Sequence, residues 1–173
     1  MKSTGIIRRI DDLGRVVIPK EIRKNLNIKE NDSLEIFIDG ENIILKKYSN
    51  LSKVEKLFNK YINILNEITS NSVIITDREK VLATTKKEEK LIGKEISAYL
   101  DNILESRNKV LSNDNRGLEI TKGNILEGNY YILPMIVNSD INGLIIIISN
   151  NEISDLSKVG LEIINKIIIS SME

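Results

Sequence analysis

The 173-residue sequence contains no cysteine and no histidine. Without thiol or imidazole groups the chain cannot form disulfides, zinc sites of the thiolate or imidazole type, or catalytic dyads and triads that use these groups. The acidic residues are scattered, and no pair of them stands out as a general acid and base. We therefore expect a protein that is not an enzyme and that has no metal site and no cofactor.

Long hydrophobic runs are also missing. The longest apolar run, Leu144 to Ile148, has five residues, whereas a membrane-spanning helix needs about 20. The charged first ten residues are not followed by an apolar stretch that could serve as a signal peptide. With 41% hydrophobic and 29% charged residues the composition is globular, so we expect a cytoplasmic protein without a membrane partner.

Charge is balanced over the whole chain but not along it. Residues 1–29 carry eight basic and three acidic side chains, a balance of +5, whereas the remaining residues are mildly acidic. Confinement of cationic character to one short segment is typical of a surface that binds nucleic acid. Double-stranded DNA is thus the expected partner of the N-terminal end.

The N-terminal pattern predicts a β-β-α-β-β module of fewer than 50 residues. Its predicted elements are a strand at 5–10, a turn at 11–14, β structure at 15–18, a helix at 20–26 after Pro19, and a hairpin of 33–38 and 42–46 around Asp39-Gly40. Such a module buries little apolar surface, and no disulfide or metal can stabilise it. Dimerisation is therefore expected.

A helix over residues 52–69 is predicted next, with Ser52 and Glu55 as its capping box. A second long helix is predicted at about 152–169. Apolar residues on both helices follow a spacing of three and four, so they are candidate oligomerisation contacts. These candidates are Val54, Phe58, Tyr61, Leu65, Ile68, Ile153, Leu156, Ile163 and Ile167. Leu57, Ile62 and Ile64 give the first helix a second apolar face, so it could pack on its own domain and on another subunit. The alternative is a first helix that packs wholly within its own domain.

Between these helices the pattern predicts an antiparallel sheet with helices packed on it, which makes the chain an α+β protein. Predicted elements are a hairpin of 72–76 and 81–84, a helix at 97–105, a weakly patterned segment at 108–128, and strands at 130–137 and 143–149. We predict a DNA-binding domain at 1–48, a connecting first helix at 49–70 and a second domain at 71–173.

Residues 2–23, KSTGIIRRIDDLGRVVIPKEIR, and residues 32–48, DSLEIFIDGENIILKKY, closely resemble the AbrB family of transition-state regulators. Residues 74–83, IITDREKVLA, and 91–97, LIGKEIS, are similar to a GAF domain. The resemblance implies a swapped-hairpin β-barrel, in which two chains interleave their N-terminal hairpins into one dimer. It implies further that the GAF-like domains assemble a homotetramer, and that the protein activates and represses sporulation genes late in the forespore.

The family motif implies DNA contacts at Arg8, Arg9, Arg15, Arg23 and Lys24, with Lys2 and Lys20 as weaker candidates. Arginine suits such contacts because its planar fork binds a phosphate or a guanine edge bidentately. Since Arg8 and Arg9 fall on opposite faces of the predicted strand, one of them could instead form an ion pair with Asp11 or Asp12.

Two further expectations stay open. GAF-like domains often enclose a small-molecule pocket, and Tyr99, Tyr130 and Tyr131 could line one or could be core residues; the ligand is not identified by the sequence. The alternative function is that of an antitoxin, a DNA-binding protein whose C-terminal part binds a toxin.

Overall fold

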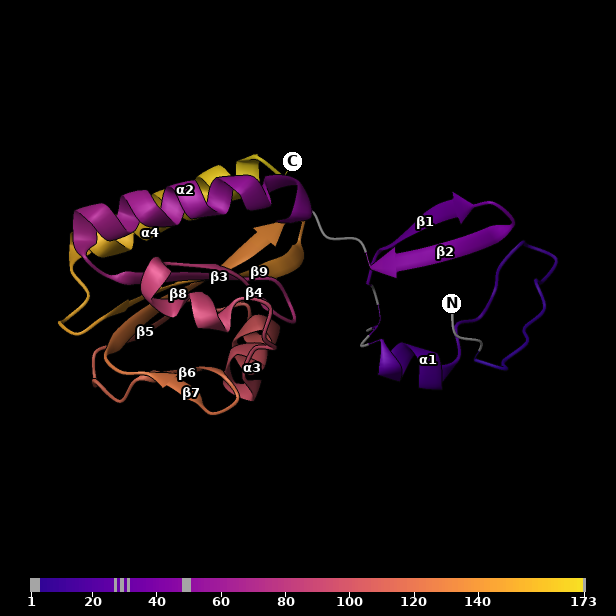
Figure 1. Cartoon of the computed structure of the whole chain (residues 1–173), viewed down its shortest axis with the longest axis horizontal. Coiled ribbons are helices and arrows are strands. Elements are labelled where there is room, and N and C mark those ends of the chain that lie inside the picture. Colours follow the sequence, from indigo (N-terminus) through magenta and orange to yellow (C-terminus); the bar gives the residue numbers. More distant parts are fainter. Residues whose placement is uncertain (1–3, 27, 29, 31, 48–50, 173) are drawn as a thin grey trace. The chain divides into compact units, whose positions relative to one another are not determined.

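The computed structural model describes residues 4–172 apart from 27, 29, 31 and 48–50, and of residues 51–56 the backbone alone (Figure 1). The chain divides into two compact units, residues 1–48 and residues 49–173. We call them the N-terminal unit and the C-terminal unit and describe each by itself.

The N-terminal unit contains one short helix and one hairpin. Helix α1 spans Lys20–Asn25 and begins after Pro19, whose φ of −58° suits a helix start. Strands β1 (Leu34–Asp39) and β2 (Asn42–Lys47) pair antiparallel, with Asp39 opposite Asn42. The hairpin loop is therefore Gly40-Glu41, one residue later than the predicted turn, and Gly40 supplies its positive φ of 59°.

The strands predicted at 5–10 and 15–18 are absent from the described single chain, so that prediction was wrong for the isolated protomer. The two segments share a backbone hydrogen bond from Asp11 N to Arg15 O (3.0 Å), at the turn between them. A β-strand needs a neighbouring strand for its backbone groups, and alternating side chains alone do not provide one.

The hairpin of the N-terminal unit has an uncovered apolar face. Ile36 lies opposite Leu45 and Ile38 opposite Ile43, so the four side chains share one face of the hairpin. All four are exposed, Ile38 by 82%. We call them the hairpin patch. Within the described part of this unit Pro19 alone is buried.

The C-terminal unit is built on a five-stranded antiparallel sheet with the order β4-β3-β9-β8-β5. The strands are β3 (Ser72–Thr76), β4 (Val81–Thr84), β5 (Val110–Ser112), β8 (Asn129–Val137) and β9 (Asp140–Ser149). A separate hairpin pairs β6 (Leu118–Thr121) with β7 (Asn124–Leu126). The helical elements are α2 (Leu51–Thr69), the 3-10 helix η1 (Lys86–Leu91), α3 (Ala98–Ser106) and α4 (Asp155–Ser170).

Both faces of this sheet are covered. Helices α2 and α4 lie side by side over one face, and α3 packs on the other together with the β6-β7 hairpin (Figure 1). The run Leu144 to Ile148 in β9 is fully or nearly fully buried because alternate residues enter the two cores. Gly160 lets α4 approach α2 closely, since a Cβ there would lie 2.7 Å from Leu65 Cδ1.

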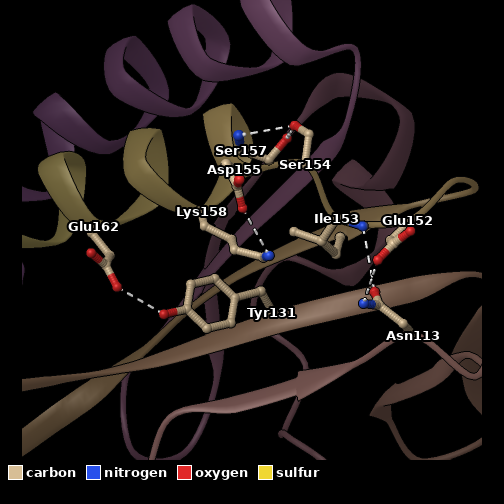
Figure 2. Close-up of polar contacts among 9 residues, drawn as sticks. All are labelled: Asn113, Tyr131, Glu152, Ile153, Ser154, Asp155, Ser157, Lys158 and Glu162. Atoms are coloured by element: carbon tan, nitrogen blue, oxygen red, sulfur yellow. Dashed lines mark hydrogen bonds and ion pairs between the residues drawn. The ribbon is translucent and has the colours of Figure 1, made fainter.

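Hydrogen bonds fasten the N-terminal half of α4 to the sheet (Figure 2). Ser154 caps the helix by accepting from Ser157 N (3.2 Å). The Tyr131 hydroxyl on β8 donates to Glu162 Oε1 (2.8 Å), and Lys109 Nζ donates to the same oxygen at the same distance. Lys109 and Tyr131 lower the pKa of Glu162 through these bonds. The position of α4 is thus fixed by polar contacts as well as by the core.

Most predicted elements of the C-terminal unit are confirmed within two or three residues. The 3-10 helix η1 was missed because Leu91 is its one apolar residue. Strands β5, β6 and β7 in the segment 108–128 were missed because three or four residues show little periodicity, and the equally short β4 was predicted through the polar turn that joins it to β3. The predicted capping box of α2 lies outside the described side chains.

Candidate nucleic-acid interface

The predicted DNA-contacting side chains that the structure describes are all exposed. They are Arg8, Arg9, Arg15, Lys20, Arg23 and Lys24; Lys2 lies outside the described residues. Exposure keeps these cations hydrated and available to an anionic partner. Their exposure is compatible with contact to DNA, and their role in DNA binding stays a prediction.

Three of these cations share one face of α1. Lys20, Arg23 and Lys24 are spaced by three and four residues, so they project from the same side, away from the half-buried Ile22. The helix is held by hydrogen bonds from Arg23 N to Pro19 O (2.9 Å) and from Leu26 N to Ile22 O (3.0 Å). A helix of six residues thus presents three positive charges together.

Arg15 is positioned by the turn that precedes it. Asp11 Oδ1 accepts hydrogen bonds from Leu13 N (3.0 Å) and Arg15 N (2.8 Å), while Asp11 Oδ2 accepts one from Arg15 Nε (2.8 Å). Gly14 completes the turn with a φ of 75°. The backbone and side-chain hydrogen bonds from Arg15 lower the pKa of Asp11.

This geometry corrects the predicted ion pair. Asp11 pairs with Arg15, not with Arg8 or Arg9. The turn folds the chain so that the guanidinium of Arg15, four residues later, reaches the Asp11 carboxylate. Arg8 Nη1 donates instead to the neighbouring Ile7 O (3.5 Å). The Arg15 side chain remains 71% exposed while its Nε is held, so the outer end of the guanidinium can still contact a phosphate.

The predicted oligomerisation residues divide by burial. Phe58, Leu65 and Ile153 are at most 3% exposed and belong to the core beneath α2 and α4, so their assignment to a subunit interface was wrong. These side chains already have neighbours within the chain. Tyr61 is half-buried, and Val54 lies outside the described side chains.

The other four predicted residues, Ile68, Leu156, Ile163 and Ile167, are exposed. Three more apolar side chains on the same two helices are exposed. Leu57 and Ile64 were predicted as part of a second apolar face, whereas Val159 was missed. On α2 the spacing 57, 61, 64, 68 repeats the three-and-four pattern, shifted from the predicted one. Helix α2 thus carries two overlapping apolar patterns, and the tertiary structure decides which residues of each pattern are buried.

The tyrosines predicted as alternative pocket or core residues do not line one pocket together. Tyr130 and Tyr131 are adjacent on β8 and enter opposite cores. Tyr99 and Tyr130 share a hydrogen bond between their hydroxyls (3.1 Å), which raises the pKa of Tyr99 to about 12. Both β8 tyrosines are thus core residues with a hydrogen-bonded hydroxyl.

Comparison with known proteins agrees with this arrangement of two units. A family model described as stage V sporulation protein T C-terminal, transcription factor, matches residues 53–170. The chain is 41% identical over 155 residues to stage V sporulation protein T of Bacillus subtilis (strain 168), covering 88% of this chain and 87% of the relative. The chain belongs to the stage V sporulation protein T family. It is accordingly a DNA-binding transcription regulator of a sporulation family.

Each unit of this family member also has relatives of its own. The N-terminal 48 residues are 67% identical to the transition state regulatory protein AbrB of Bacillus subtilis (strain 168), covering 28% of this chain and 50% of AbrB. A family model described as antidote-toxin recognition MazE, bacterial antitoxin, matches residues 7–52. The prediction of an AbrB-type N-terminal module is confirmed.

The C-terminal unit has the GAF fold. The GAF domain from Acinetobacter phosphoenolpyruvate-protein phosphotransferase superposes with a TM-score of 0.57 at 8% identity, covering 73% of this chain and 84% of that domain. At that identity the likeness concerns the fold and nothing more. Among the described helices none is long and apolar enough to cross a membrane.

Proposed function

We propose that two chains join their N-terminal units into one DNA-binding module by interleaving hairpins, and that this module binds operator DNA. The observation that supports this most is the hairpin patch of Ile36, Ile38, Ile43 and Leu45, which a single chain leaves in water. Large exposed apolar faces on soluble proteins mark interaction surfaces. A second hairpin with the same patch is self-complementary, as a two-fold interface requires.

The DNA contacts of this module are Arg8, Arg9, Arg15, Arg23 and Lys24, supported by Lys2 and Lys20. The five principal cations of each chain become about ten in a dimer, enough for counterion release to dominate affinity. Arg15 is the most informative of them, because Asp11 holds its Nε in a fixed turn and leaves the outer guanidinium exposed.

The test is the salt dependence of DNA affinity for wild type and Arg15→Ala. We expect the substitution to weaken binding about five- to a hundredfold and to reduce the slope of log affinity against log salt by about one for each arginine lost. Lys122→Ala, which removes an exposed cation of the C-terminal unit, is the control. Unchanged affinity and slope for Arg15→Ala would contradict the assignment.

We propose further that C-terminal units join two dimers into a tetramer through the outward faces of α2 and α4. On α4 the exposed residues Leu156, Val159, Ile163 and Ile167 form one stripe, and on α2 Leu57, Ile64 and Ile68 form another. Because the two helices lie side by side (Figure 1), we infer that the two stripes together form one apolar surface. Ile163→Asp should convert tetramers to dimers in native mass spectrometry, whereas the exposed polar change Asn63→Ala should leave tetramers intact.

The biological role proposed here is activation and repression of sporulation genes in the cytoplasm of the forespore at a late stage. It is supported by the family to which the chain belongs. Deleting the gene and profiling transcripts through sporulation tests it: both increases and decreases confined to late forespore genes are expected.

The second candidate function is that of an antitoxin, which has the match of residues 7–52 in its favour. The test of this alternative is whether a toxin co-purifies with the protein from its host. If none does, the antitoxin function is wrong.

A further inference from the structure

The C-terminal unit contains a pocket of about 740 Å³ beside the end of the sheet. It lies where the C-terminal end of α2, the 3-10 helix η1, strand β7 and the end of β9 meet. Its lining is mainly polar and includes Asn66, Asn71, Thr85, Glu88 and Ser149. Small-molecule sites in proteins commonly have volumes of about 300 to 1,000 Å³. The size therefore suits a small ligand.

Thr85 places an unsatisfied polar atom in the wall behind this pocket. Its Oγ1 is buried and has no hydrogen-bond partner among the described residues, and the whole residue is 3% exposed. Its backbone groups are engaged, since Thr85 N donates to Val73 O (3.0 Å) and Thr85 O accepts from Glu88 N (2.9 Å). Burying a hydroxyl without a partner destabilises a protein, so the wall beneath Glu88 is not optimised for stability alone.

Glu88 adds a buried acidic side chain one turn further on. It is 5% exposed and lines the same pocket. Among the ion pairs of the described residues none involves Glu88. A carboxylate removed from water requires a cationic or hydrogen-bond-donating partner. The inner wall of the pocket is thus suited to an ammonium group.

The outer rim of the pocket has the opposite charge. Lys86, Lys87 and Lys90 all project from η1, line the pocket and are exposed. A ligand that reaches from the inner wall to this rim would place its anionic group near these lysines. We propose that the pocket binds a small zwitterion of the amino-acid type, with its ammonium group against Glu88 and its carboxylate toward the lysines.

Two lining residues connect this site to the helix pair. Asn66 Nδ2 on α2 donates to Asn71 O (2.8 Å), and Asn71 Nδ2 donates to Ser157 Oγ on α4 (2.9 Å). Ser157 in turn belongs to the cap formed by Ser154 (Figure 2). A ligand in the pocket would therefore lie beside the hydrogen bonds that join α2 to α4 and could change how the two helices pack. Its regulatory consequence rests on the proposed function, whereas binding itself does not.

The experiment measures the Tm of the C-terminal unit in the full-length protein with each of the twenty common amino acids at millimolar concentration. The best one is then compared with the matching amine and the matching carboxylic acid, which each lack one charged group. We expect at least one amino acid to raise the Tm and both truncated analogues to bind at least about tenfold more weakly. If no amino acid raises the Tm, the proposal is wrong.

Variants distinguish this pocket from any other site. Glu88→Gln should weaken binding in calorimetry about ten- to a hundredfold, because a charge-assisted hydrogen bond is lost. The matched control is Glu89→Gln, which changes the neighbouring exposed glutamate that does not line the pocket. Equal affinities for the two variants would overturn the assignment.

Thr85→Val separates stability from binding. Because the hydroxyl lacks a partner and is not accessible from the pocket, we expect the variant to raise the Tm without ligand and to leave amino-acid affinity nearly unchanged. Thr84→Val is the control, since Thr84 Oγ1 donates to Thr85 O (3.1 Å) and its loss should lower the Tm. A Thr85→Val variant that loses amino-acid binding would contradict the assignment of the ammonium site to Glu88.

DNA affinity, measured with and without the amino acid, separates the two proposals. If an amino acid raises the Tm but the protein shows no specific DNA binding, the ligand site is supported and the proposed function as a regulator is wrong. If the protein binds DNA specifically but no amino acid raises its Tm, the ligand site is wrong and the proposed function as a regulator is unaffected.

Discussion

The two units of this chain differ most in what happens to their apolar side chains. In the N-terminal unit the described large hydrophobic residues are exposed or half-buried, including the whole hairpin patch. Among the described side chains of the C-terminal unit thirty hydrophobic residues are buried, and they fill a core on each face of one sheet. The C-terminal unit therefore has a hydrophobic core of its own. The N-terminal unit has apolar side chains as well, but in the single chain they do not form a core.

Size explains much of this difference. The fraction of surface that a chain buries on folding falls as the chain shortens, and units near 40 to 50 residues usually need a disulfide, a metal or a partner. The sequence offers the N-terminal unit no cysteine or histidine for the first two. A partner chain remains, and with it the same segment can complete both its β structure and its core.

The largest effect is expected from a charge placed in the hairpin patch. Ile38→Asp should reduce specific DNA binding on the order of a thousandfold or more, because a charged group would be buried between two chains. The Tm of the C-terminal unit should not change. The matched control is Ile92→Asp, which changes an exposed isoleucine of the C-terminal unit and should leave DNA affinity intact. Equal behaviour of the two variants would mean that the hairpin patch is ordinary surface.

An intermediate effect is expected from the core of the other unit. Phe58 is fully buried beneath α2, so Phe58→Ala should lower the free energy of unfolding of the C-terminal unit by about 3 to 5 kcal/mol. Asn63→Ala on the exposed side of the same helix should change it by less than about 0.5 kcal/mol. Denaturant unfolding followed by circular dichroism measures both. A small loss for Phe58→Ala would show that the core relaxes around the cavity.

The smallest effect concerns a single bond in the C-terminal unit. Hydrogen bonding to Tyr130 raises the pKa of Tyr99 to about 12 from its ordinary value of 10.0. Because the folded pKa is the higher one, the stabilising bond is fully present below pH 10 and is lost as pH rises from 10 to 12. The pKa of Tyr131 is raised as well, by burial and by its hydrogen bond to Glu162. Absorbance titration should therefore show more than one late-ionising tyrosine, and Tyr99→Phe should remove the step near pH 12. A titration curve unchanged by that substitution would assign the late step to another tyrosine.

How far the sequence could predict the fold depended on element length. The long helices and the strands at 72–76 and 129–137 were predictable because their periodicity extends over several residues, whereas β5, β6, β7 and η1 are too short. The AbrB-like motif predicts which cations of the N-terminal unit contact DNA. Their ion pairing could not be predicted, because the turn at Asp11 decides which arginine reaches the carboxylate.

The sequence by itself determined the division into a cationic N-terminal module and an α+β domain, since charge distribution, hydrophobic periodicity and the AbrB-like motif are local properties of the chain. Only the tertiary structure decided which helix faces are buried. Phe58 and Ile68 belong to one predicted heptad pattern, yet one is fully buried and the other is 61% exposed. The pocket beside Thr85 and Glu88 is likewise a tertiary property, because its walls come from α2, η1, β7 and β9, which meet only once the sheet has formed.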